Sequence, residues 1–163
     1  MKSPRLLVAI LALPLAVGLA GCAPAVVMEA APDAENPDCA SVIVRLPDSV
    51  AGLESRETDA QATAAWGDPT GVLLTCGVPV PGPSEMDCIE IDGIDWLRDA
   101  SNDELTLFTT YGRDPAITVG IDPAAVSGGP ALADLTSAVR TIEQTRTCLS
   151  RLDVIDPTQA PTG

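Results

Sequence analysis

Apolar and polar residues follow a strand-like pattern in several short stretches of the chain, and residues that favour turns separate these stretches. A half-buried strand alternates apolar and polar side chains, whereas a buried strand is a short apolar run. These patterns predict strands at residues 41–46, 72–76, 105–110 and 117–121. The chain is therefore expected to contain a β-rich domain.

The clearest hairpin in the sequence lies at residues 88–97, where Asp92-Gly93 separates two alternating runs. Asp-Gly at this position is typical of a type I′ turn, because both turn residues need a positive φ. In that register the isoleucines and Trp96 share one face, which we expect to be buried. Glu90 then lies across from Asp95 on the other face, a pair of like charges that sheets normally avoid.

Two further segments complete the predicted fold. Residues 57–66 contain an Ala-rich run with helical propensity, yet turn residues at 67–71 and the strand after them favour a hairpin. Near the C-terminus the apolar period becomes that of one face of a helix. The stripe consists of Leu132, Leu135, Val139 and Ile142.

Together these elements predict the α+β class, with an antiparallel sheet of about five to seven strands and one C-terminal amphipathic helix packed on a face. The expected boundaries are a signal peptide at residues 1–21 and a lipidated disordered tether at 22–37. A single α+β domain then covers 38–152, and a disordered tail covers 153–163.

The N-terminal leader predicts export. A basic start is followed by an apolar run, residues 6–19, which is too short to cross a bilayer as a helix. The segment Leu19-Ala20-Gly21-Cys22 resembles the lipobox of bacterial lipoproteins, in which the cysteine is acylated and becomes the first residue after cleavage. The alternative is an ordinary secretory signal that leaves Cys22 as a spare thiol.

Charge and composition exclude several classes of function. Of nine Lys and Arg residues, Lys2 and Arg5 precede Cys22, so the mature chain has seven against 23 acidic residues, a net charge of −16. Such a chain repels phosphate backbones, so nucleic acid is not an expected partner. There is no His, and no Lys after Lys2, which excludes His-based triads and Schiff-base lysines. We expect neither a cofactor nor a resident metal.

Besides Cys22, the chain has four cysteines, and an even number in an exported protein indicates two disulfides with three possible connectivities. From their positions in the predicted fold, Cys76–Cys88 and Cys39–Cys148 are the expected pairs. The first would close the Gly- and Pro-rich loop between two strands, and the second would tie the first strand to the segment after the helix.

Three segments resemble an actinobacterial family of secreted or lipid-anchored proteins that is defined only by a domain of unknown function. They are residues 61–69, 73–77 and 108–113, with the sequences QATAAWGDP, LLTCG and FTTYGR. The resemblance implies a location at the outer face of the cytoplasmic membrane. It also implies a protein that is, by default, not an enzyme. It implies no reaction, ligand or catalytic residue.

Two groups of residues are candidates for chemistry. The acidic hairpin comprises Asp87, Glu90, Asp92, Asp95 and Asp99. It could hold a cation such as Ca²⁺, or it could supply paired carboxylates for acid–base catalysis. The alternative is a solvated acidic surface in an acid-rich chain.

The second group is Trp66, Tyr111 and Arg113, which are expected in turns, and aromatic and Arg side chains often anchor binding surfaces. Their alternative role is to fill the ends of a thin core. We therefore expect a membrane-anchored envelope lipoprotein that binds or scaffolds an envelope protein or a wall polymer. The alternative function is a carboxylate-based hydrolase acting on an envelope polymer.

Overall fold

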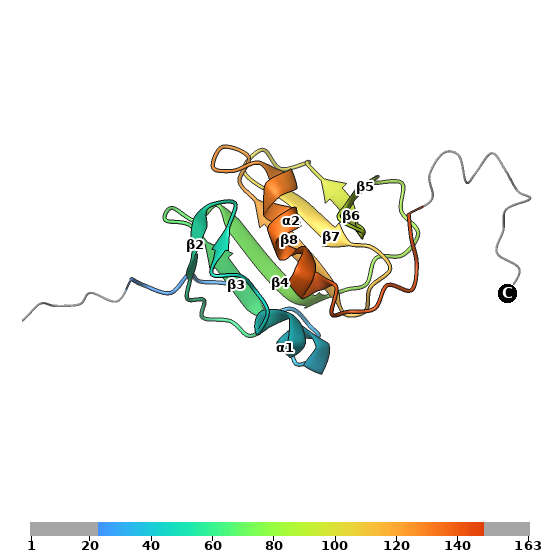
Figure 1. The fold of residues 1–163 in the computed structure, drawn as a ribbon, viewed down its shortest axis with the longest axis horizontal. Helices are drawn as coiled ribbons and strands as arrows, with labels where there is room; N and C mark the ends of the chain where they lie inside the picture. Colours follow the sequence, from blue (N-terminus) through green and yellow to red (C-terminus); the bar gives the residue numbers. More distant parts are fainter. Residues whose placement is uncertain (1–22, 149–163) are drawn as a thin grey trace, which may run out of the picture.

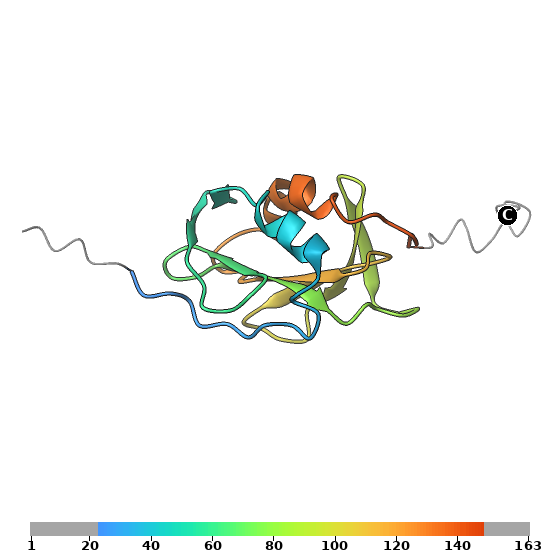
Figure 2. The same cartoon turned by 90° about the horizontal axis from the view of Figure 1, so that it is seen from below.

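A computed structural model describes residues 23–148 of the chain. These residues form one antiparallel sheet of eight strands, and two helices lie on the same side of it (Figures 1 and 2). In chain order the elements are α1 (Pro37–Ile43), β1 (Ser49–Val50), β2 (Leu53–Arg56), β3 (Thr63–Trp66), β4 (Val72–Val78), β5 (Asp87–Ile91), β6 (Ile94–Asp99), β7 (Thr106–Thr110), β8 (Ala116–Ile121) and α2 (Gly128–Val139). We call the side that carries the helices the helix face and the opposite side the open face.

The strand order, β1-β2-β3-β4-β8-β7-β6-β5, makes the chain cross the sheet once. After β4 the chain reaches the far edge at β5 and then returns strand by strand to β8, which pairs with β4. Because neighbouring strands lie about 4.8 Å apart, the connection at residues 79–86 spans about 19 Å. Its alternating prolines, Pro79, Pro81 and Pro83, favour the extended backbone that such a crossing needs.

The prediction of an α+β fold with an antiparallel sheet is confirmed, but eight strands replace the expected five to seven. The two additional strands are β1 and β2, which have two and four residues. Both lie between residues 49 and 56, where the sequence shows no sustained alternation. Strands this short leave too few residues for a periodic signal.

The expected strand at residues 41–46 is wrong, because most of this segment belongs to helix α1 or follows it directly. Asn36 is the N-cap, and its side chain accepts a hydrogen bond from the Asp38 backbone NH at 3.0 Å. A proline occupies the first turn, where a missing NH has no cost. The helix buries Cys39 and Val42, whereas Val44 after its end is 77% exposed. Capping and a spacing of three residues therefore override the local alternation.

The core lies between the sheet and helices α1 and α2. The predicted stripe of α2 and the turn after it is confirmed, since Leu132, Leu135, Val139 and Ile142 are all buried. Opposite them, register partners such as Leu74, Val119 and Phe108 point to the helix face from neighbouring strands. The helices therefore cover one face of the sheet (Figure 2), as in a two-layer α+β domain.

Both predicted hairpins are present. In β5 and β6 the register pairs Ile91 with Ile94 and Glu90 with Asp95, and Asp92-Gly93 forms the turn with φ of 48° and 75°. Trp96 is buried, as its position in that register predicts. Strands β3 and β4 also pair as an antiparallel hairpin, so the strand interpretation of residues 63–66 is confirmed.

The four cysteines form two disulfides, as expected, but both predicted pairings are wrong. The bonds are Cys39–Cys76 and Cys88–Cys148, with Cα–Cα distances of 5.6 and 6.3 Å. Cys76 cannot reach Cys88 because three strands separate β4 from β5. The register also places Cys76 on the helix face and Cys88 on the open face. The sequence could not reveal this, because strand order is a non-local property.

Residues 23–36, which we expected to belong to a disordered tether, instead lie against the domain. Val26 forms a bridge with Thr58, and its NH donates to the Glu57 carbonyl at 2.8 Å. The Asp33 NH donates to the Gly77 carbonyl at 3.0 Å. Gly77 has a φ of +90°, and a Cβ there would overlap the Asp33 backbone. Main-chain hydrogen bonds of this kind do not depend on side chains, so the pattern of apolar residues does not predict them.

The expected signal peptide, the lipidation site Cys22 and the tail at 153–163 lie outside the described residues, as do the last residues of the expected domain. Within residues 23–148, no helix combines the length and apolar character needed to span a membrane.

Candidate functional site

The structure places Trp66 and Arg113 inside the protein, which contradicts their prediction as an exposed recognition surface. Trp66 is 1% exposed, and its indole NH donates to the Pro47 carbonyl at 3.1 Å. Arg113 is 4% exposed and donates to the Ile142 carbonyl and to Gln144 Oε1. Both residues therefore fill and tie together the ends of a core that has few other aromatic side chains.

The charge of Arg113 is partly balanced inside the protein. Burial lowers the pKa of Arg113, the nearby carboxylate of Asp95 raises it, and Arg140 lowers it again. Tyr111 is half-buried, and the guanidinium of Arg146 lies 5.3 Å from the centre of its ring. Arg146 also donates to the Pro81 carbonyl at 3.0 Å. Tyr111 therefore supports the crossing loop through Arg146.

The acidic hairpin separates into one buried carboxylate and several exposed ones. Asp95 is 7% exposed, and its Oδ2 accepts hydrogen bonds from Gln144 Nε2 at 3.0 Å and from the Cys148 NH at 2.8 Å. Glu90 is exposed, and its Oε1 accepts from the Gly93 NH at 2.7 Å. Asp95 and Glu90 both line a pocket of about 490 Å³ beside the Cys88–Cys148 disulfide.

A half-buried acid at the end of this hairpin, Asp99, has a local structural role. The pKa of Asp99 lies below its ordinary value because its carboxylate accepts hydrogen bonds from the Ser101 side chain and backbone. The backbone contact, from the Ser101 NH to Asp99 Oδ1, measures 2.9 Å. This carboxylate therefore stabilises the turn that follows β6.

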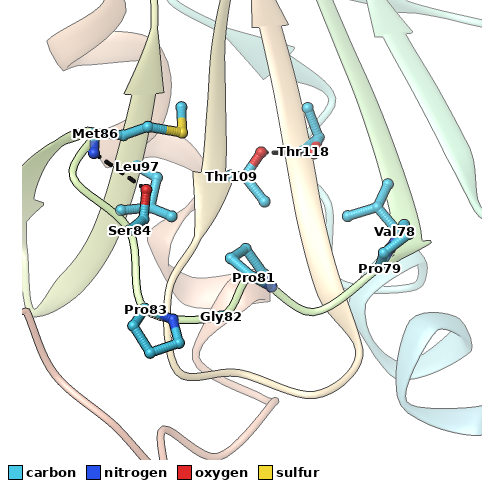
Figure 3. Close-up of a pocket in the computed structure, with 10 residues that line it drawn as sticks. All are labelled: Val78, Pro79, Pro81, Gly82, Pro83, Ser84, Met86, Leu97, Thr109 and Thr118. Atoms are coloured by element: carbon cyan, nitrogen blue, oxygen red, sulfur yellow. Dashed lines mark hydrogen bonds between the residues drawn. The ribbon is translucent and has the colours of Figure 1, made fainter.

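The open face carries a different kind of pocket, which sequence analysis missed. The crossing loop at residues 79–86 lies over strands β6, β7 and β8 and borders an open space of about 400 Å³ (Figure 3). We call this space the proline-loop pocket. It is lined by Val78, Pro79, Pro81, Gly82, Pro83, Ser84, Met86, Leu97, Thr109 and Thr118. The loop was predicted only as an irregular connection, and its alternating prolines were the available signal.

None of the ten described lining residues carries a charge, although the whole chain has a net charge of −14. The floor is polar in its centre, where the hydroxyls of Thr109 and Thr118 hydrogen-bond at 2.9 Å (Figure 3). Ser84 Oγ accepts from the Met86 NH at 3.1 Å. The pocket therefore offers apolar contacts and a few hydroxyls within an acidic protein.

Three exposed apolar side chains belong to the crossing loop or to the open face of β7. Among the described residues, five large hydrophobic side chains are exposed, and Val80, Met86 and Leu107 are three of them. Val80 and Met86 lie on the crossing loop, and Leu107 lies on β7 on the same face as Thr109. Clusters of exposed apolar side chains mark interaction sites on soluble domains.

The open face therefore has a mixed surface around the pocket. A row of register partners, Thr75, Thr118 and Thr109, crosses β4, β8 and β7. No helix of the described chain covers this face, as Figure 2 shows. The arrangement can bind a neutral, partly apolar surface.

Comparison with known proteins identifies a family. Residues 5–148 match the family described as "Protein of unknown function (DUF3515)". The chain belongs to this family. No curated protein and no solved structure matches the chain. Family membership therefore assigns neither a ligand nor a reaction, and a functional proposal has to come from the site itself.

Proposed function

We propose that this DUF3515 protein is a lipid-anchored envelope protein, held by Cys22 at the outer face of the membrane, that binds a protein partner on its open face. The observation that carries the binding function is the uncharged proline-loop pocket with Val80, Met86 and Leu107 exposed around it. Anchoring is supported by the leader that precedes Cys22. The two disulfides support an oxidising compartment.

A protein partner suits this surface better than a wall polymer. Sugar rings commonly stack on exposed aromatic side chains, and the pocket lining contains none. Both Trp66 and Trp96 are buried, and Phe108 faces the helices. An apolar protein surface can instead pack against Met86, Leu107 and the prolines while its polar groups bond to the hydroxyls.

The docked N-terminal segment changes the expected distance from the membrane. A free tether of fifteen residues would span roughly 20 Å. The domain already holds the chain at Pro24, whose carbonyl accepts a hydrogen bond from Arg56 Nη2 at 3.1 Å, and at Val26, which pairs with Thr58. Pro24 lies two residues after Cys22, and two extended residues reach about 7 Å at most. The domain is therefore held close to the membrane surface.

The anchoring part is tested by replacing Cys22 with Ala. We expect the variant to leave the membrane fraction or to accumulate as an uncleaved precursor, because stable anchoring requires the acyl chains. Cys22→Ser, which keeps a similar size, should behave in the same way. A variant that fractionates and migrates like the wild type would contradict lipidation.

The binding part is tested by adding charge to the open face. In Val80→Glu with Met86→Glu, both changes are at exposed positions, so the domain should stay folded while binding is lost. Truncation of a hot-spot residue typically costs about 2 kcal/mol or more of binding free energy. Val44→Glu is the matched control, because Val44 is also exposed but lies beside α1. Equal co-purification of a membrane partner with all three proteins would contradict the proposal.

A carboxylate-based hydrolase is the second candidate, and one observation favours it. Glu90 and Asp95 are register partners and line the same pocket. However, one oxygen of each carboxylate already accepts hydrogen bonds from the protein. If the hydrolase interpretation is correct, Asp95→Asn should abolish cleavage of purified cell-wall polymer. If the wild-type protein shows no cleavage of any wall fraction, this candidate is rejected.

A further inference from the structure

We propose that Cys88, Asp95 and Cys148 form a binding site for a thiophilic divalent cation, such as Zn²⁺, when the Cys88–Cys148 disulfide is reduced. The two sulfur atoms and a carboxylate oxygen of Asp95 all lie within 4.8 Å of one another. Within residues 23–148, no other group of three or more potential ligands of this kind meets that criterion.

The fold brings the three ligands together from three separate segments. Cys88 is on β5 and Asp95 is on β6, and both point to the open face. Cys148 follows α2, and the chain before it is held by two hydrogen bonds from Thr145 to the Gly112 carbonyl. These contacts do not depend on the disulfide itself, so the segment has other interactions that keep Cys148 in place.

Asp95 is already oriented as a ligand. Gln144 Nε2 and the Cys148 NH both donate to Oδ2. Oδ1 accepts no hydrogen bond from any described residue and remains available for a cation. Gln144 is fixed in turn by Arg113, which donates to its Oε1 at 3.1 Å. Outer hydrogen bonds of this kind orient metal ligands and strengthen binding.

The donor set selects the metal class. Two thiolates and one carboxylate suit Zn²⁺, with metal–sulfur bonds of about 2.3 Å and metal–oxygen bonds of about 2.0–2.2 Å. In a tetrahedron these bond lengths separate the ligand atoms by about 3.6–3.8 Å. The two sulfur atoms, which are bonded to each other in the disulfide, must therefore move apart after reduction, while the Asp95 carboxylate already lies within 4.8 Å of both. The fourth position opens into the pocket of about 490 Å³, where water can complete the shell.

Reduction controls the site because only thiolates bind the metal. A dithiol transfers two electrons and two protons to the disulfide, giving two cysteine thiols and the oxidised reductant. Zn²⁺ then displaces one proton from each thiol. Cys88 and Cys148 are half-buried beside an open pocket, whereas Cys39 and Cys76 are fully buried. A reductant therefore reaches the Cys88–Cys148 bond first.

The test uses the mature chain, treated with a limiting amount of a phosphine reductant, which becomes its oxide as two thiols form. Cd²⁺ is the probe because its bonds to thiolates give an ultraviolet charge-transfer band. We expect one Cd²⁺ per chain after reduction, displacement of Cd²⁺ by Zn²⁺, and no band in the oxidised protein. Cys88→Ser with Cys148→Ser should abolish the band.

The role of Asp95 distinguishes this site from a simple pair of thiols. Asp95→Asn should weaken Cd²⁺ binding by about tenfold or more, on the scale seen when metal sites lose supporting interactions. Asp99→Asn is the matched control, because Asp99 is a carboxylate on the same strand but is not a member of the group. Circular dichroism checks that the reduced protein keeps its fold.

Three outcomes would overturn the proposal. The first is the absence of a Cd²⁺ band after reduction of Cys88–Cys148. The second is a band that persists in the double Ser variant and therefore depends on Cys39 and Cys76. The third is equal affinity in the wild type and Asp95→Asn. An unfolded reduced chain would also give the third result, because its thiols would bind Cd²⁺ without help from Asp95.

Discussion

Replacing Cys39 and Cys76 together with Ala should remove much of the stability of the domain. The bond joins positions 37 residues apart, and closing such a loop stabilises the folded state by about 3.8 kcal/mol in the chain-entropy model. Both cysteines are fully buried, so deleting each sulfur costs about 0.8 kcal/mol more, by analogy with a buried CH₂ group. The expected loss is therefore about 5 kcal/mol, against a typical total of about 5–15 kcal/mol.

The assay is equilibrium unfolding of the oxidised proteins in urea. Thermal unfolding gives a second readout. For the 126 residues from 23 to 148, the typical unfolding entropy means that each kcal/mol of lost stability lowers the melting temperature by about 4 °C, or by about 20 °C in total. A loss below about 2 kcal/mol, less than the disulfide contribution alone, would refute the expectation that this bond, which joins α1 to β4, stabilises the domain by closing the loop.

The same experiment can test the pairing directly. In the single variant Cys39→Ala, the structure predicts that Cys76 becomes the free thiol while Cys88–Cys148 stays intact. Alkylation in denaturant without reduction, followed by mass spectrometry, identifies the free cysteine. Alkylation of Cys148 instead of Cys76 would show that the Cys39–Cys148 pairing expected from the sequence is correct.

Two further predictions concern the corrected parts of the fold. Gly77→Ala should destabilise the domain by about 1–2 kcal/mol or more, because its φ is positive and a Cβ would displace Asp33; unchanged urea unfolding would show that residues 23–36 do not dock there. Trp66→Ala should lower the unfolding free energy by about 3–5 kcal/mol, as large buried side chains do; a variant of unchanged stability that lost partner binding would restore the surface role.

The sequence predicts those parts of the fold that depend on short-range patterns. The Asp92-Gly93 hairpin and the helical stripe beginning at Leu132 are local, because turn chemistry and side-chain period are set within a few residues. Helix α1 was missed because Asn36 and its capping contact outweigh an alternation of only six residues. Alternation and helix capping are competing local signals, and a single capping residue is hard to recognise in a sequence.

The candidate site was missed for a different reason. The proline-loop pocket exists because β5 lies at the far edge of the sheet, so the chain has to cross the open face. No local pattern specifies strand order. The choice of Trp66 and Arg113 relied on the scarcity of such residues, but a core with few aromatics buries the large side chains that it has.

Photo-crosslinking in intact cells tests the proposed binding function most directly. A photoreactive amino acid replaces Leu107 on the open face in one protein and Val44 beside α1 in another, and both positions are exposed. The proposal predicts that position 107 crosslinks to one envelope protein and that Val80→Glu with Met86→Glu abolishes this product, while position 44 does not give it. The same product from position 44, or no product from position 107, would contradict binding on the open face.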